Sequence, residues 1–370
     1  MSLKCAIGLM SGTSMDGIDI AVVATDGQRV VNRGASGFVA YEPEFQQRIA
    51  RALPVSRSIT SREQRPGDLA ELEREITARH IAAVRTFLAD HPQLHPDLIG
   101  FHGQTVFHAP DRGITVQIGD GEMLAREAGI PVIWDMRAND MRHGGQGAPL
   151  VPAYHAALAA SLAPEHRRFP LCFVNIGGIS NITFVPEAGD PIAFDSGPGN
   201  ALIDQWVSKR SDVSYDADGR IASKGSVSQA IADKFLNSSF FSKNIPKSLD
   251  RNDFTLQHME GLSLEVGART LASVSARAIH ASERLLPEQP ILWILCGGGR
   301  KNPYIVGDLR DAVAGAARVV MAEDVGLDGD AMEAEAWAYL AVRAERGLPL
   351  TFPTTTGCRE PVSGGLLAKP

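Results

Sequence analysis

Short apolar runs alternate with longer amphipathic segments along the chain. The segment 61–91 repeats apolar residues at helical spacing, with charged residues on the opposite face. The apolar positions of that face are Leu69, Leu72, Ile76, Ala83 and Phe87. Apolar runs of strand length precede and follow this segment, among them 6–10, 18–23, 171–176 and 291–296. Strands mixed with long helices in this way predict an α/β fold.

Three glycine-rich turns interrupt the apolar runs. The first, SGTSMDG at 11–17, separates two strand-like runs, and NIGGISN at 175–181 repeats the same design. The third, CGGGRKN at 296–302, joins a fully apolar run to a segment of helical pattern. Glycines let backbone N–H groups approach an anion, and hydroxyls add donors. Each turn alone could be a plain connection. Together, in this order, they predict two phosphate-binding hairpins and a later nucleotide-binding turn.

Length and charge narrow the class of protein. A chain of 370 residues predicts two domains, and no proline- or serine-rich linker separates them. The net charge of −7 argues against nucleic acid or an anionic membrane as the main partner. We see neither an apolar run of membrane-spanning length nor an N-terminal signal segment, and therefore expect a cytoplasmic protein. The cysteines Cys5, Cys172, Cys296 and Cys358 lack metal-type spacing, and three of them lie in apolar or glycine-rich surroundings and are expected to be packed thiols.

Several acidic residues are candidates for chemistry. Asp195 follows an apolar run that ends at Phe194 and precedes the turn SGPGN, so it is either a residue of the crevice at the end of a strand or a stabiliser of the turn. Asp135 and Asp140 could form a glycosidase acid–base pair. Glu333, three residues after Asp330, fits a helix capping box.

Motifs from one end of the chain to the other resemble the bacterial anhydro-N-acetylmuramic acid kinases, which belong to the actin-like ATPase and sugar kinase superfamily. They include GLMSGTSMDGIDIA, HGQTVFHAP, GGQGAPLVPAYH, NIGGISNIT, FDSGPGNALID, PKSLDR, CGGGRKNPYI and MEAEAWAYLA. The resemblance implies two domains, each with a mixed sheet flanked by helices, around an interdomain cleft. We assign residues 1–130 plus 335–370 to the first domain and 131–334 to the second.

The family reaction opens 1,6-anhydro-N-acetylmuramic acid with water and phosphorylates the freed O6 from ATP. The products are N-acetylmuramic acid 6-phosphate and ADP, in peptidoglycan recycling and amino sugar catabolism. The motif FDSGPGN implies that Asp195 is the general base that activates the water. A chaperone-like ATPase and an ordinary hexose kinase acting on a free hydroxyl are the alternative functions.

The resemblance also assigns the nucleotide contacts. The phosphates would meet the first hairpin at Gly12, Thr13, Ser14, Met15, Asp16, Gly17, Ile18 and Asp19, and the second at Gly177, Gly178 and Ser180. Gly297, Gly298 and Gly299 would leave room for the adenosine. Asp16 or Asp19 would hold Mg²⁺, through water, because this ion keeps much of its hydration shell. Asp19 could instead be an ordinary exposed strand residue.

The sugar contacts implied by the resemblance are His102, Gln104, Thr105, Arg137, Asp140 and Glu333. Arg137 suits the lactyl carboxylate of a muramic acid, although a surface ion pair is its plainer interpretation. The chain departs from the family pattern at Leu249, where threonine is usual, and at Ser196, where cysteine also occurs. A homodimer is a further expectation from the family.

Overall fold

The computed structural model describes residues 2–12, 14–249 and 253–370. They fold into two compact units, one formed by Met1–Ser161 with Ala331–Pro370 and the other by Leu162–Asp330. Each unit is built around its own mixed β-sheet, so the predicted α/β class is confirmed.

The first unit contains a sheet in the order β12-β6-β4-β1-β2-β3, with β5 paired to β4. Its strands are β1 (Lys4–Ser11), β2 (Gly17–Thr25), β3 (Val31–Ala40), β4 (Leu98–Ala109), β5 (Ile114–Ile118), β6 (Val132–Trp134) and β12 (Leu366–Ala368). Its helices are α1 (Pro43–Ser56), α2 (Leu69–Asp90), α3 (Gly121–Ala128), α4 (Ala138–Arg142), α5 (Pro152–Ser161), α10 (Met332–Glu345) and α11 (Pro353–Thr356). β1 pairs antiparallel with β2 and parallel with β4, so the first glycine-rich turn is a hairpin, as the sequence predicts.

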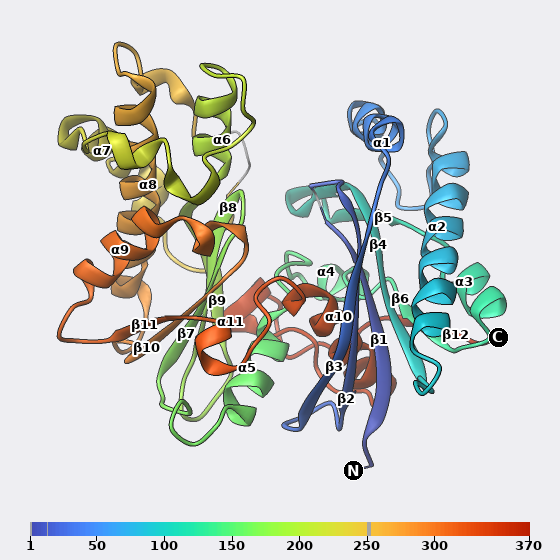
Figure 1. Ribbon diagram of the computed structural model, residues 1–370. Coiled ribbons are helices and arrows are strands. Elements are labelled where there is room, and N and C mark those ends of the chain that lie inside the picture. Colours follow the sequence, from blue (N-terminus) through green and yellow to red (C-terminus); the bar gives the residue numbers. More distant parts are fainter. Residues whose placement is uncertain (1, 13, 250–252) are drawn as a thin grey trace. The chain divides into compact units, whose positions relative to one another are not determined.

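Helix α10 packs directly on one face of this sheet, across β1, β2 and β4 (Figure 1). Glycines make this close approach possible. A Cβ atom added to Gly8 would lie 1.8 Å from the carbonyl oxygen of Ala334, and one added to Gly100 would lie 2.1 Å from that of Trp337. Neighbouring residues of the same strands, such as Ile7, point to the other face of the sheet.

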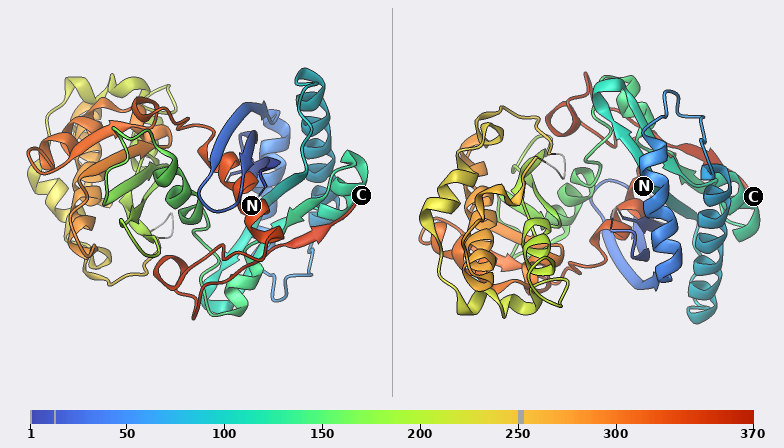
Figure 2. Two further views of the ribbon diagram at one scale, coloured as in Figure 1. Left: turned by 90° about the horizontal axis from the view of Figure 1, so that it is seen from below. Right: turned by 90° about the horizontal axis from the view of Figure 1, so that it is seen from above.

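The other face of the sheet is covered by α1 and α2, whose apolar residues share one hydrophobic core with the strands; α2 lies beside the strands in Figures 1 and 2. The predicted amphipathic face of α2 is confirmed, because all five of its apolar positions are buried. These are Leu69, Leu72, Ile76, Ala83 and Phe87. They join Ile7, Leu9 and Phe101 in one hydrophobic core.

The boundary between the units differs from the predicted one. We assigned residues from 131 onward to the second domain, but β6 pairs in parallel with β4 in the first sheet. Helix α5 contacts β3 and α10, and therefore also belongs to the first unit. No composition change marks position 161, which explains why the sequence did not reveal it.

The second unit contains the sheet β11-β10-β7-β8-β9. Its strands are β7 (Leu171–Ile176), β8 (Ile179–Val185), β9 (Ile192–Pro198), β10 (Leu292–Cys296) and β11 (Arg318–Met321). Its helices are α6 (Ala201–Ser208), α7 (Gln229–Leu236), α8 (Leu264–Ala281) and α9 (Pro303–Ala312). β7, β8 and β9 are antiparallel neighbours, whereas β10 runs parallel to both β7 and β11. Helix α8 packs on β8 and β9, and α9 packs on α8 and β11.

Two further sequence expectations can be compared with the structure. Cys172, Cys296 and Cys358 are buried thiols, as expected for three of the four cysteines, and Cys5 is half-buried. Among the described residues, no helix has both the length and the apolar character needed to cross a membrane.

The close packing of α10 on the sheet leads to a first prediction. Gly100→Ala should lower the free energy of unfolding by about 3 kcal/mol, because the new methyl group would overlap backbone atoms of α10. Gly37→Ala, on β3 of the same unit, is the matched control, since its methyl would meet Phe87 at an ordinary 3.5 Å. The control should change stability by no more than about 0.5 kcal/mol. Equal urea-unfolding midpoints for the two variants would contradict this account of the packing.

Candidate active site

The first hairpin presents a tight polar turn at the end of β1. The amide of Met15 donates to the carbonyl of Gly12 at 3.1 Å, and Met15 has a positive φ of 59°. The hydroxyl of Ser14 donates to Oδ1 of Asp16 at 2.5 Å. Ser14 and Asp16 are exposed, so the turn presents hydroxyl and carboxylate groups at its surface. The predicted contact Thr13 lies outside the described residues.

The remaining predicted residues of this hairpin lie within β2. Gly17 and Ile18 are buried, and Asp19 is half-buried and pairs with Met10 of β1 and Phe38 of β3. A Cβ atom on Gly17 would lie 2.4 Å from the carbonyl oxygen of Val39. Packing against β3 therefore explains this glycine without any ligand.

A buried polar network fixes the end of β1. Ser11 Oγ lies 2.9 Å from His80 Nε2 and 3.0 Å from the hydroxyl of Tyr41. His80 Nδ1 lies 2.8 Å from the carbonyl oxygen of Ile76, which can only accept, so Nδ1 carries the proton and Nε2 accepts from Ser11. Burial lowers the pKa of His80 to about 4, so the ring stays neutral at physiological pH.

Gln104 links the hairpin to the predicted sugar segment on β4. Its Nε2 donates to the carbonyl oxygen of Gly12 at 3.1 Å, which fixes the orientation of the amide. Its Oε1 is buried and has no hydrogen-bond partner among the described residues. A buried carbonyl oxygen without a donor is costly, so this atom suits a ligand hydroxyl. The neighbouring Thr105 accepts from Gln117 Nε2 at 3.1 Å.

Arg137 and His102 form the centre of the predicted sugar site. Nε and Nη2 of Arg137 lie 3.3 and 3.2 Å from His102 Nε2, and Nη1 donates to the carbonyl of Gly147 at 2.8 Å. The ring of Trp337 lies 4.6 Å from that of His102 and 5.3 Å from the guanidinium. Burial lowers the pKa of Arg137 to about 10, against the opposing charges of Glu333 and Asp140. Burial and the arginine charge together keep the pKa of His102 well below its usual range.

Asp140 has a structural role. Its carboxylate is buried and accepts three hydrogen bonds of 2.6 Å, from the amide of Gly147 and the hydroxyls of Thr351 and Thr356. Both oxygens are therefore engaged within the protein, and the structure favours support of the Gly147 loop over direct contact with a sugar. Asp135 forms an ion pair with Arg62, so both carboxylates of the suggested acid–base pair are engaged within the protein.

The capping-box interpretation of Glu333 is wrong. Helix α10 begins at Met332 without a side-chain cap. The carboxylate of Asp330 instead accepts from Arg300 Nη1 at 2.9 Å and Lys301 Nζ at 3.0 Å, which lowers its pKa to about 2. Glu333 acts electrostatically on Arg137, as expected if both belong to one site. Its contact with sugar stays a prediction.

In the second unit, two glycine turns lie at one edge of the sheet. β7 and β10 are parallel neighbours, so Gly177, after β7, and Gly297, after β10, follow adjacent strand ends. The carbonyl of Gly177 accepts from the amide of Asn200 at 2.8 Å, immediately before α6. Gly178 is exposed, whereas the side chain of Ser180 is fully buried. The Ser180 hydroxyl, like Gln104 Oε1, has no hydrogen-bond partner among the described residues, so its contact with a phosphate stays a prediction beside that of the two glycines.

The three glycines of the third turn differ in what surrounds them. A Cβ atom on Gly297 or Gly299 would lie 2.2 Å from atoms of β7, and Gly297 has a positive φ of 73°. At Gly298 the nearest such atom is 3.9 Å away, and this glycine is exposed. Packing thus explains Gly297 and Gly299, while Gly298 leaves open space for a ligand.

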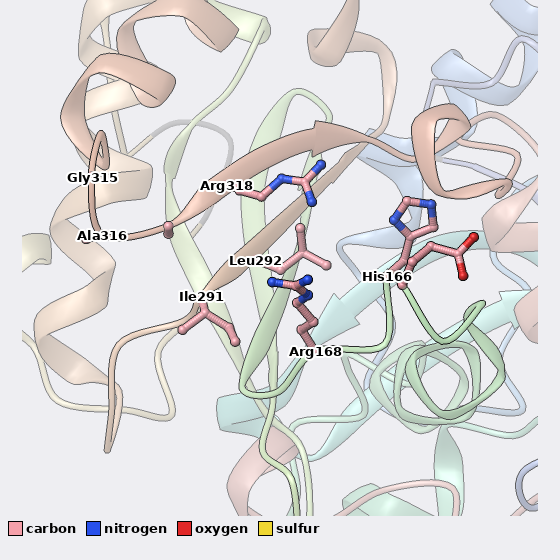
Figure 3. A pocket seen from close by; sticks show the side chains of 9 residues that line it. His166, Arg168, Ile291, Leu292, Gly315, Ala316 and Arg318 are labelled. Carbon is pink, nitrogen blue, oxygen red and sulfur yellow. The ribbon is translucent and has the colours of Figure 1, made fainter.

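A cavity of about 540 Å³ lies beside this turn. It is lined by Arg300, Lys301 and Val306, and by Met321 and Glu323 at the carboxyl end of β11. Open α/β sheets bind ligands at the carboxyl ends of their strands. A second cavity, of about 430 Å³, is lined by Leu292 and Arg318 at the amino ends of β10 and β11, at the opposite edge (Figure 3). The first cavity is therefore the better candidate for the nucleotide.

Asp195 lies inside β9 rather than after its end, because the strand continues to Pro198. Its amide donates to the carbonyl of Lys247 at 3.1 Å, and its Oδ2 accepts from the amide of Leu249 at 2.7 Å. Burial raises the pKa of Asp195 to about 6, against the opposing effects of the Leu249 amide and the Lys247 charge. The carboxyl group is thus suited to accept a proton near neutral pH.

Sequence reasoning missed three residues around these sites. Tyr41 and His80 anchor the first hairpin, and Trp337 stacks on His102. Trp337 could have been found, because it lies four residues after Glu333 and hence on the same face of α10. Ser11 contacts Tyr41 and His80, which are far from it in the sequence, so no local sequence pattern indicates these contacts.

Comparison with known sequences decides the family. The sequence model of the anhydro-N-acetylmuramic acid kinases matches residues 4–369. The chain belongs to this family. Curated kinases of this name from Agrobacterium fabrum and Rhizobium etli are 55% and 54% identical to it, covering 99% and 100% of this chain and 99% of each relative. The relative from Brucella canis is 55% identical over 100% of this chain and 99% of its own length.

Anhydro-N-acetylmuramic acid kinases are phosphotransferases with an alcohol acceptor, and this chain is therefore an enzyme of that class. Solved structures give a more distant likeness. A glucokinase from Streptomyces griseus, in complex with glucose and AMPPNP, is 15% identical with a TM-score of 0.39, over 91% of this chain and 99% of that one. A dehydratase activator from Clostridium difficile, with bound ADPNP, is 12% identical with a TM-score of 0.42, over 92% and 96%. The family assignment rests on the sequence matches.

The differing surroundings of the glycines lead to a second prediction. Gly298→Ala should fold normally and raise the KM for ATP about tenfold, because its methyl group would occupy the open space beside the turn. Gly37→Ala, on β3, is the control, since its methyl group would meet Phe87 at an ordinary 3.5 Å and Gly37 is not among the residues that line the cavity beside the turn. Steady-state kinetics with varied ATP would measure the effect. An unchanged KM in Gly298→Ala would remove this turn from the nucleotide site.

Proposed function

We propose that the enzyme opens the 1,6-anhydro bridge of anhydro-N-acetylmuramic acid with water and transfers the γ-phosphoryl group of ATP to O6. The products are N-acetylmuramic acid 6-phosphate and ADP. The observation that carries this proposal is Asp195, a largely buried carboxyl group with a pKa near 6 and an orientation fixed by the Leu249 amide. Such a group is ionised at neutral pH and can take a proton from water.

The proposed reaction balances as one coupled displacement. A water oxygen forms a bond to C1 as the bond from C1 to O6 breaks, and Asp195 takes the proton from the water. The freed O6 attacks the γ-phosphorus, and the bond from that phosphorus to the bridging oxygen of ADP breaks. Hydrolysis of the bridge thus supplies the nucleophile for phosphoryl transfer.

Three glycine turns support the proposed nucleotide contacts. The exposed turn around Gly12 and Ser14, with its hydroxyls and backbone amides, suits the β- and γ-phosphates. Gly178 lies beside the amino end of α6, where the helix dipole favours an anion. Gly298 and the cavity next to it would receive the adenosine.

Mg²⁺ would accompany the nucleotide. The carboxylates of Asp16 and Asp19 are hard oxygen ligands of the kind this ion prefers. Among the described residues, no group of three or more His, Cys, Asp or Glu side chains could hold a metal. A metal held mainly by phosphate oxygens and water, with Asp16 or Asp19 reaching it through water, fits this donor set. The ion would neutralise phosphate charge when bound.

The sugar would bind to the cluster of His102, Gln104, Arg137 and Glu333 in the first unit. Arg137 would pair with the lactyl carboxylate, and the unpartnered Oε1 of Gln104 would accept from a sugar hydroxyl. Asp140 would position Arg137 through the Gly147 loop, to which both residues bond.

A cytoplasmic location, a homodimer and a role in peptidoglycan recycling stay predictions. They rest on the family and on the reaction proposed for it.

A third prediction concerns the general base. Asp195→Asn should lower kcat about 1,000-fold and leave nucleotide affinity unchanged, because the amide cannot take a proton from water. Its melting temperature at pH 7 should not fall. The folded pKa exceeds the ordinary one, so the ionised carboxylate costs stability above pH 6, and the neutral amide removes that cost.

The matched control for this variant is Asp204→Asn. Burial and the charge of Asp216 also raise the pKa of Asp204 to about 6, but we assign it no chemical role. This control should retain turnover. Comparable activity in Asp195→Asn, or comparable loss in both variants, would remove Asp195 from the role of base.

A fourth prediction concerns the products. Incubation with ATP and the anhydro sugar should add one water and one phosphoryl group to the sugar, as read by mass spectrometry. Free N-acetylmuramic acid should not be phosphorylated at a comparable rate, because it lacks the bridge whose opening supplies O6. Preferred phosphorylation of the free sugar would indicate an ordinary hexose kinase. ATP hydrolysis without sugar modification would indicate a chaperone-like ATPase.

A further inference from the structure

The segment that precedes Asp250 runs beside β9 and contacts Asp195 at two points. The carbonyl of Lys247 accepts from the Asp195 amide at 3.1 Å, and the amide of Leu249 donates to Oδ2 of Asp195 at 2.7 Å. Both contacts use backbone atoms of the segment. The departure from the family pattern at Leu249 therefore leaves the contact with the carboxylate intact.

The side chain of Lys247 is buried among aromatic rings. It is 6% exposed, and its Nζ lies 4.2 Å from the ring centroid of Phe240, 5.6 Å from that of Phe194 and 5.9 Å from that of Phe241. The faces of aromatic rings attract a cation. Within the described ranges, no carboxylate lies within 4 Å of this ammonium group, so it is not neutralised by a close ion pair there.

The charges around Lys247 define a pH window. Burial and the cations Arg284 and Lys243 lower the pKa of Lys247 to about 8, against the opposing charge of Asp195. The charge of Lys247 in turn lowers the pKa of Asp195, which burial raises; the resulting pKa of Asp195 is about 6. Between pH 6 and 8 the lysine is therefore cationic while the aspartate is anionic.

A purely structural role does not explain this lysine. An apolar side chain of similar length would fill the space among three phenylalanines without the cost of burying an ammonium group. The positive charge of Lys247 instead acts on Asp195, the carboxylate that the proposed chemistry needs in its ionised form.

We propose that Lys247 is a positioning residue for Asp195: its ammonium group, held against Phe240, stabilises the ionised carboxylate while the Leu249 amide orients it. This inference rests on the proposed function of Asp195 as the base. It goes beyond that function because it names a second residue, one that does not touch substrate. This residue helps to set the pH above which Asp195 is ionised.

The test compares the pH dependence of kcat/KM for the anhydro sugar in wild type, Lys247→Met, Lys247→Arg and Lys243→Met. Wild type should lose activity on acidification with a midpoint near pH 6. In Lys247→Met this midpoint should move upward by about one pH unit, since an opposite charge is removed. Lys247→Arg should restore the wild-type midpoint. Lys243→Met, which removes an exposed cation of the same segment, should not move it.

A Lys247→Met profile that superimposes on that of wild type would overturn the inference. A measurement on the wild-type enzyme covers the case in which this variant does not fold. With ¹³C-carboxyl-labelled aspartate, the resonance assigned to Asp195 by its loss in Asp195→Asn should show a main step near pH 6 and a smaller one near pH 8, as Lys247 loses its charge. Absence of the second step would equally overturn it.

These outcomes separate this inference from the proposed function. Full activity in Asp195→Asn would refute the base, whatever the NMR titration shows. An inactive Asp195→Asn together with an unmoved midpoint in Lys247→Met would refute only the role of Lys247.

Discussion

The chemistry proposed for this enzyme depends on one ionisable group held in a low-dielectric position. Burial makes Asp195 a better base by raising its pKa, and the amide of Leu249 and the charge of Lys247 limit that rise. With burial alone the carboxyl group would be protonated too readily to act at neutral pH. Without burial it would bind a proton too weakly. The value near 6 results from the balance of these effects.

The scaffold supplies rigid supports for the ligand groups. In the first unit, α10 approaches the sheet closely through Gly8 and Gly100, and this approach places Trp337 against His102. The buried Ser11 network then fixes the end of the strand from which the first turn begins. The side chains proposed to bind the sugar therefore project from packed helices and strands, which limits their motion.

The sequence predicted those features that depend on local patterns. The α/β class, both hairpins and the amphipathic helix α2 follow from periodicity and glycine-rich turns, and the structure confirms them. Features that depend on distant contacts were not accessible. The unit boundary near residue 161 is set by the pairing of β6 with β4. Asp330 fits a capping pattern, yet an ion pair with Arg300, thirty positions earlier, uses its carboxylate.

The role proposed for Lys247 could not be predicted from the sequence either. Its neighbours in sequence show a short polar motif, whereas its aromatic surroundings come from β9 and from η4 (Ser239–Ser242). Of the predicted nucleotide residues, Ser14, Gly178 and Gly298 are exposed, whereas Gly17, Ser180 and Gly299 are buried. Contacts of the predicted residues with ligands stay predictions.

The most direct test of the central claim is a crystal structure with the anhydro sugar and a non-hydrolysable ATP analogue bound together. The account predicts an ordered water within hydrogen-bond distance of the Asp195 carboxylate and next to C1, on the face opposite the bond to O6. Asp195 out of reach of C1, or another side chain holding that water, would contradict it.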